Sequence, residues 1–123
     1  VLDGVVSTWT NCGQVIGGYD FVNEDDDPMD DNGHGTHVAG IVASQNPTYK
    51  GVAPGANIVA AKVLNSAGSG WFTDIAAAID WCMDNKDTYN IVAMSLSLGD
   101  GGEYTDPTTE CDPYLTANAV LLN

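Results

Sequence analysis

The segment at residues 56–64 constrains the fold of this chain more than any other. It is a nearly continuous run of apolar residues, and turn-forming residues bound it on both sides. A strand with one solvated face alternates apolar and polar residues, whereas a run without alternation is typical of a strand buried on both faces of a parallel sheet. The sequence therefore predicts a central strand of a parallel sheet that helices cover on both faces.

The flanking segments indicate an α/β fold in which strands and helices alternate. Further apolar runs typical of strands begin the chain and recur at residues 15–21 and 90–98. Helical spacing of apolar residues occurs at residues 34–44 and again after Thr73, which is placed to cap a helix with a core-facing stripe of Ile75, Ile79 and Met83. No linker interrupts the pattern, so residues 1–123 are expected to form one domain or part of one.

The balance of charge excludes one class of partner. The chain has 17 Asp plus Glu against three Lys plus Arg, a formal net charge of −14. A phosphate backbone is bound by a concentrated basic face, so no nucleic acid partner is expected. No apolar stretch has the length of a bilayer span, so no membrane association is expected either. The acids are densest at residues 24–31, where a solvated surface explains most of the charge and a structural calcium ion is expected on Asp25, Asp27 and Asp30.

The cysteines indicate no metal or disulfide framework. Cys12, Cys82 and Cys111 are an odd set without C-x-x-C spacing. Cys82 lies in a helical segment and is expected to be a buried thiol. Cys12 and Cys111 could pair with each other or with a cysteine outside this chain.

The string DNGHGTHVAG at residues 31–40 carries both histidines of the chain at the start of an expected helix. Taken alone, His34 and His37 could be metal ligands, a catalytic base with a structural neighbour, or two polar residues at a helix end. The whole string resembles the histidine motif of the subtilisin-like serine proteases. Further strings resemble the same family in the same order, namely GVAPGA at 51–56, KVL at 62–64, GSG at 68–70 and MSLSLG at 94–99. The sequence is therefore identified as a member of that family.

This resemblance implies the N-terminal half of a subtilisin-like catalytic domain, with a doubly wound, mostly parallel sheet and helices on both faces. It implies a serine-type endopeptidase that hydrolyses peptide bonds with a Ser-His-Asp triad. His34 is then the catalytic base, and His37 has a structural role. A general base has to sit on a rigid element, and the small residues that follow on the helix allow it to pack closely against its neighbours.

Asp3 is the candidate for the triad carboxylate, which orients the imidazole and stabilises the imidazolium. It ends an apolar strand and so resembles the family's V-x-D-[ST]-G pattern. The hydroxyl residue of that pattern is missing here, because Gly4 follows Asp3 directly. Asp31 is nearer to His34 in the sequence, but it lies in a loop where the family's acid does not.

The family holds its substrate peptide extended between two backbone segments that act as neighbouring strands. The matching residues are Gly68, Ser69 and Gly70 on one side and Ser97, Leu98 and Gly99 on the other. Trp71 and Phe72 would border a pocket beside the first segment, or else pack as core aromatics. The partners implied are protein or peptide substrates, the remainder of the catalytic domain and a propeptide, and the protein is expected to be secreted.

The family's serine motif, G-T-S-M-A, and its oxyanion turn, A-A-G-N, do not occur in this sequence. A base and an acid without a nucleophile do not make a protease, so residues 1–123 are expected to end before the serine motif and to be inactive alone. Catalysis by the triad needs no cofactor. The alternative is a catalytically inactive subtilase-like module that binds peptides or calcium. A zinc protein built on His34 and His37 fails for lack of two further ligands at suitable spacing.

Overall fold

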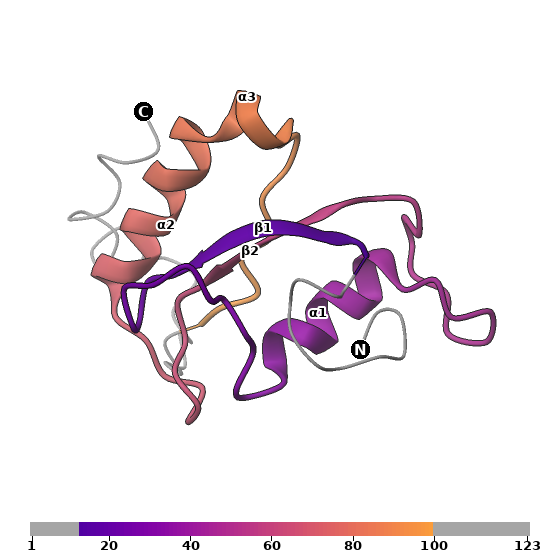
Figure 1. Ribbon diagram of the computed structural model, residues 1–123. Helices are drawn as coiled ribbons and strands as arrows, with labels where there is room; N and C mark the ends of the chain where they lie inside the picture. Colours follow the sequence, from indigo (N-terminus) through magenta and orange to yellow (C-terminus); the bar gives the residue numbers. More distant parts are fainter. Residues whose placement is uncertain (1–12, 100–123) are drawn as a thin grey trace, which may run out of the picture. The chain divides into compact units, whose positions relative to one another are not determined.

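A computed structural model of the chain describes residues 13–99 of the 123. Its elements, in chain order, are β1 (Val15–Asp20), α1 (His34–Ala43), β2 (Ile58–Lys62), α2 (Phe72–Asp84) and α3 (Lys86–Tyr89) (Figure 1). The chain divides into two compact units, the first ending at Ala93 and the second beginning at Met94. All of these elements belong to the first unit. The predictions for Asp3, Cys12 and Cys111 lie outside the described residues.

β1 and β2 pair as parallel strands, and α1 connects them along the chain. This βαβ arrangement confirms the predicted parallel sheet with a crossover helix. In Figure 1, α1 lies below the two strands, and α2 and α3 lie above them. The register pairs Val15 with Ile58, Gly17 with Val59, Gly18 with Ala60, Tyr19 with Ala61 and Asp20 with Lys62, with an irregularity between Val15 and Gly17.

The predicted central strand is shorter and less buried than expected. β2 occupies only residues 58–62 of the predicted 56–64, and all of its residues are half-buried. The strand ends at Lys62 because its partner β1 ends opposite, at Asp20. Within residues 13–99, β2 is hydrogen-bonded to β1 alone, so its second edge has no strand beside it.

The prediction of a strand at residues 90–98 is wrong for the described part of the chain. Asn90 has a left-handed backbone conformation, and residues 91–99 carry no regular secondary structure. A strand is defined by its ladder of hydrogen bonds, and neither β1 nor β2 pairs with this segment. Apolar composition alone therefore does not make it a strand, and the Val92 side chain is 88% exposed.

The second helix also differs from its prediction. α2 begins at Phe72, its N-cap residue is Trp71, and no side chain caps it. Thr73 is therefore inside the first turn, where its hydroxyl lies 3.3 Å from a carboxylate oxygen of Asp74. Met83 does not join the core stripe, because the residue is 59% exposed. None of the described helices is both long and apolar enough to cross a membrane.

The helices α2 and α3 contact β1 and Phe21, the residue that follows it, through a series of aromatic side chains. The ring centroids lie 4.9 Å apart for Tyr19 and Phe21, 6.4 Å for Phe21 and Trp81, and 5.9 Å for Trp81 and Tyr89. Gly17 lets Tyr89 approach the strand, since a Cβ at this position would lie 2.6 Å from the tyrosine ring. The thiol of Cys82, in α2, is half-buried rather than buried, and this burial raises its pKa.

Candidate active site

His34 is the first residue of α1, and its side chain is exposed. The preceding N-cap residue, Gly33, has a φ of 101°, a left-handed conformation that glycine adopts without steric cost. The first backbone bond of the helix runs from the N–H of His37 to the carbonyl of Gly33, at 3.1 Å. His37 is exposed on the same helix. The helix start thus presents an imidazole to solvent on a regular element.

The carboxylate of Asp30 organises this helix start. One oxygen accepts the N–H groups of Asn32, at 3.0 Å, and Gly33, at 2.7 Å, while the other accepts the N–H of Thr36 at 2.7 Å. Burial alone would raise the pKa of Asp30, but the hydrogen bonds from Gly33, Thr36 and Asn32 outweigh it and lower the pKa to about 2. An ionised carboxylate therefore satisfies N–H groups that the helix leaves unpaired at its N-terminus.

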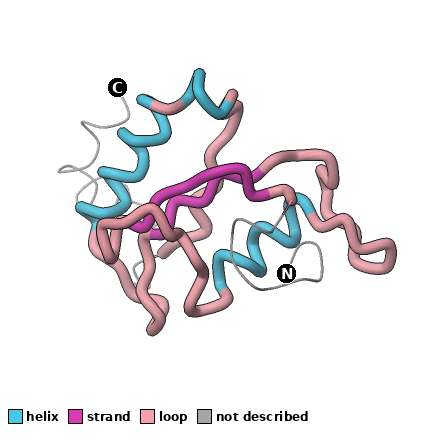
Figure 2. Tube along the Cα trace, viewed as in Figure 1, coloured by secondary structure: helices cyan, strands magenta, loops and turns pink. Residues whose placement is uncertain are grey.

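Asn32 connects the helix start to a second segment. Its Oδ1 accepts the N–H of His34 at 3.3 Å, and its Nδ2 donates to the carbonyl of Ser66 at 3.0 Å. Ser66 belongs to the loop at residues 65–70, here called the 65–70 loop, which includes the predicted substrate residues Gly68, Ser69 and Gly70. Both this loop and the loop before α1 are drawn in pink in Figure 2. The bond between Asn32 and Ser66 joins the start of α1, which carries the predicted base, to the loop that carries one predicted substrate segment.

The 65–70 loop is closed by its own hydrogen bonds. The N–H of Asn65 donates to the carbonyl of Ser69, and the N–H of Gly68 to the carbonyl of Asn65, each at 2.8 Å. The side-chain Oδ1 of Asn65 accepts the N–H groups of Ala67 and Ser69. Gly68 has a φ of 75°, which requires glycine or a strained residue. The loop therefore has a defined shape although all of its residues are exposed.

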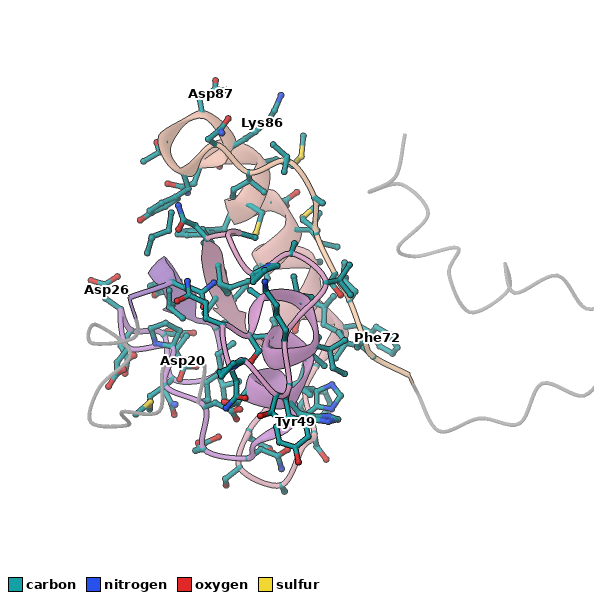
Figure 3. All side chains as sticks on the ribbon, turned by 90° about the vertical axis from the view of Figure 1, so that its right-hand side faces the viewer. Asp20, Asp26, Tyr49, Phe72, Lys86 and Asp87 are labelled. Carbon is teal, nitrogen blue, oxygen red and sulfur yellow. The ribbon has the colours of Figure 1, made fainter. Side chains whose placement is uncertain are left out.

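The other predicted substrate residues have different settings. Trp71 and Phe72 are 76% and 60% exposed, so neither is a core aromatic of the described part. Figure 3 shows Phe72 pointing outward. Ser97, Leu98 and Gly99 belong to the second unit and are exposed there. Asp3 lies outside the described residues.

The acidic loop after β1 is organised by turns and by one lysine. Asp25 accepts the N–H of Asp27 at 2.9 Å, and both side chains are exposed, as is Asp26 at the outer edge in Figure 3. Within the described residues, no group of three or more His, Cys, Asp or Glu side chains is gathered in a way that could hold a metal ion. Calcium on Asp25, Asp27 and Asp30 stays a prediction.

At the ends of the two strands, Asp20 pairs with Lys62. Their Oδ2 and Nζ atoms lie 2.7 Å apart, and the same Nζ lies 3.5 Å from Oδ2 of Asp31. Burial alone would raise the pKa of Asp20, but the bond from Lys62 and those from Asn23 and Val22 hold it below its usual value. Lys62, at the end of β2, thus holds both ends of the acidic loop, through Asp20 at its start and Asp31 near its end.

Comparison with known proteins decides the family. The profile of the subtilase family, peptidase S8, matches residues 6–120, which is nearly the whole sequence. The chain belongs to the subtilase family. The resemblance of its motifs to subtilisin-like serine proteases is thereby confirmed.

Individual subtilases are similar over much of this chain. The serine protease AprX of Bacillus subtilis is 45% identical over 113 residues, which cover 85% of this chain and 25% of AprX. Thermitase of Thermoactinomyces vulgaris is 46% identical over 91 residues, covering 72% of this chain and 31% of thermitase. A crystal structure of a cold adapted subtilisin-like serine proteinase matches with a TM-score of 0.55 and 44% identity, over 59% of this chain and 26% of that one. The chain thus spans about a quarter to a third of these subtilases.

The sequence interpretation missed the residues that organise the helix start. Asp30 was considered only as a calcium ligand, although an Asp shortly before a helix is a recognised N-terminal signal. Asn32 gave no signal, because its partner Ser66 is 34 residues away in the sequence. Asp20 follows an apolar strand, but only the register with Lys62 identifies it as an ion-pair partner.

Proposed function

We propose that this chain is the part of a subtilisin-like serine endopeptidase that carries the base and the acid of a Ser-His-Asp triad. His34 is the general base, and Asp3 orients its imidazole. The nucleophilic serine and the oxyanion donor come from a later part of the same polypeptide, so residues 1–123 have no activity alone. The observation that supports this proposal most is the exposed His34 on an organised helix start, hydrogen-bonded through Asn32 to the 65–70 loop.

The chemistry follows from the position of the imidazole. His34 takes the proton of the serine hydroxyl as that oxygen attacks the scissile carbonyl, and it then returns the proton to the leaving amine. The tetrahedral intermediate carries its negative charge on the former carbonyl oxygen, which the oxyanion donor stabilises. Asp3 stabilises the imidazolium that forms in between.

The substrate is a protein or peptide chain bound in extended form. Its backbone pairs with Gly68, Ser69 and Gly70, and Ser97, Leu98 and Gly99 are likewise assigned to substrate binding. Two features support the first assignment, namely the exposure of the 65–70 loop and the absence of side chains at two of its positions. Trp71, 76% exposed directly after the loop, borders the substrate side chains.

The protease acts outside the cell and is made with a propeptide. Support for the location comes from a similar protein of Bacillus subtilis, the minor extracellular protease Epr, which is 44% identical over 98 residues covering 78% of this chain and 15% of Epr. Mass spectrometry of the culture medium and of the cells would test this. Finding the protein only inside intact cells would contradict it.

The decisive experiment replaces each histidine in the full-length protein. We expect His34→Ala to lower kcat/KM for a peptide substrate by at least about a thousandfold, since the base is lost. His37→Ala is the matched control, an exposed histidine on the same helix, and its effect should stay within about threefold, as for a residue outside the chemistry. If His34→Ala retains the wild-type rate, the assignment of the base is wrong. A full-length chain without a serine motif would favour the inactive peptide-binding module instead.

A further inference from the structure

Asn32 makes two hydrogen bonds with one carboxamide, and they point in different directions. The Oδ1 atom accepts the N–H of His34 at 3.3 Å, and the Nδ2 atom donates to the carbonyl of Ser66 at 3.0 Å. A carboxamide carries an acceptor and a donor on one planar group, so a single Asn side chain can make both bonds. The amide therefore joins the residue that carries the imidazole to the loop assigned to the substrate.

Both sides of this bridge are fixed by other bonds. On the helix side, the carboxylate of Asp30 accepts N–H groups of Asn32, Gly33 and Thr36. On the loop side, Asn65 closes the 65–70 loop through its side chain and its backbone. A bond between two such segments sets their relative offset and does not merely link two mobile parts.

A second contact lies beside the first. A Cβ atom at Gly68 would lie 3.3 Å from Nδ2 of Asn32, so the backbone of Gly68 passes close to the carboxamide. Gly68 is one of the residues expected to pair with the substrate backbone. The position of the Asn32 amide and that of the substrate segment are therefore coupled by packing as well as by hydrogen bonding.

We propose that Asn32 is a positioning residue that sets the offset between the imidazole of His34 and a peptide bound along the 65–70 loop. This inference rests on the proposed function, because it takes His34 as the base and Gly68 to Gly70 as a substrate segment. General base catalysis requires the reacting atoms to be held close to their best positions. A displacement of about 1 Å can lower the rate by about a hundredfold.

The bridge is exposed to solvent, and this allows its geometric role to be separated from a stability role. Water replaces the partners of an exposed hydrogen bond at little cost, so removing the bond should leave the folded state nearly as stable as before. The effect should instead appear in the rate, and only for substrates that extend along the 65–70 loop.

The test compares Asn32→Asp and Asn32→Ala with the wild type in the full-length protein, on two substrates. One is an extended peptide with several residues before the scissile bond, and the other is an ester of a single acylated amino acid, too short to reach the loop. We expect Asn32→Asp, which loses the donor to Ser66, to lower kcat/KM for the peptide by about 10- to 100-fold, mainly through kcat, and that for the ester by less than about threefold. Asn57→Asp, the same charge change at an exposed residue before β2, is the control and should alter both values by less than about twofold.

Equal losses on the two substrates would overturn the proposal, as would an unchanged rate on the peptide. A partly unfolded variant lowers both rates alike, so the ratio of the two values stays informative, and Asn32→Ala provides a second measurement without an added charge. His34→Ala is assayed in parallel. If that variant remains active, the proposed function itself has failed; if it is inactive while Asn32→Asp and Asn32→Ala match the wild type, only the role of Asn32 is wrong.

Discussion

The starts of the two long helices are built in opposite ways. At the start of α1, the side chains of Asp30 and Asn32 accept backbone N–H groups of the first turn. At the start of α2, no side chain caps the helix, and the adjoining Trp71 and Phe72 are exposed. α2 is instead held further along, where Trp81 packs between Phe21 and Tyr89.

The polar bonds at the start of α1 mainly orient a functional group, whereas the aromatic packing of α2 mainly stabilises the fold. Directional polar bonds orient an exposed group without burying it, which suits an imidazole that has to meet a substrate. Aromatic packing removes apolar surface from water and contributes free energy of folding, but it hides the groups involved. Changes near α1 should therefore affect the site first, and changes along α2 should affect the fold first.

The largest effect on stability is expected at the aromatic contact of α2. Trp81→Ala removes the stacking on Tyr89 and the edge contact with Phe21, and should lower the free energy of unfolding by about 2–4 kcal/mol. Trp71→Ala is the matched control, and should change it by less than about 0.5 kcal/mol because the indole is mostly exposed. Urea unfolding of the full-length protein measures both. Equal effects of the two substitutions would contradict the view that α2 is held by the packing of Trp81 and not at its start.

A smaller effect with a defined pH dependence is expected at Asp30. The pKa of its carboxyl is about 2 in the folded protein against an ordinary 3.8, so the ionised form stabilises the fold. That contribution is fully present above about pH 4 and is lost as the pH falls toward about 2. Asp30→Ala should therefore cost about 1–2 kcal/mol at pH 7 and progressively less below pH 4.

The control for Asp30 is Asp26→Ala, an exposed carboxylate of the same loop, which should leave the free energy of unfolding within about 0.5 kcal/mol of wild type. Urea unfolding at a series of pH values gives the profile of each variant. A cost for Asp30→Ala that is the same at pH 2.5 and pH 7 would show that the carboxylate bonds do not hold the helix start.

The smallest effect is expected from calcium. If Asp25, Asp27 and Asp30 hold the ion with the weak affinity of many extracellular modules, about 1 mM calcium should stabilise the protein by about 0.4–1.4 kcal/mol. Thermal melting with calcium and with chelator at fixed ionic strength measures this shift, and Asp25→Asn should reduce it. An unchanged melting midpoint would remove the ion from this loop, and the acids would then act only through turns and the pairing with Lys62.

The elements of regular structure were largely predictable from local patterns. Apolar runs located β1 and β2, and helical spacing located α1 and α2 within a few residues of their bounds. The prediction failed where local pattern and long-range pairing diverge. Residues 91–99 are apolar enough for a strand, but they pair with neither described strand. Met83 has the spacing of a core residue, but it is 59% exposed.

The sequence by itself determined the family, the parallel βαβ unit and the position of His34 at a helix start, because these depend on motifs and on the spacing of neighbouring residues. Tertiary structure alone decided that Asn32 meets Ser66, 34 residues further along, and that Lys62 meets Asp20 across the sheet. Such contacts depend on the path of the chain between the partners and on strand register. No local pattern encodes them, because hydrogen bonds form between whichever donors and acceptors the fold brings within about 3 Å.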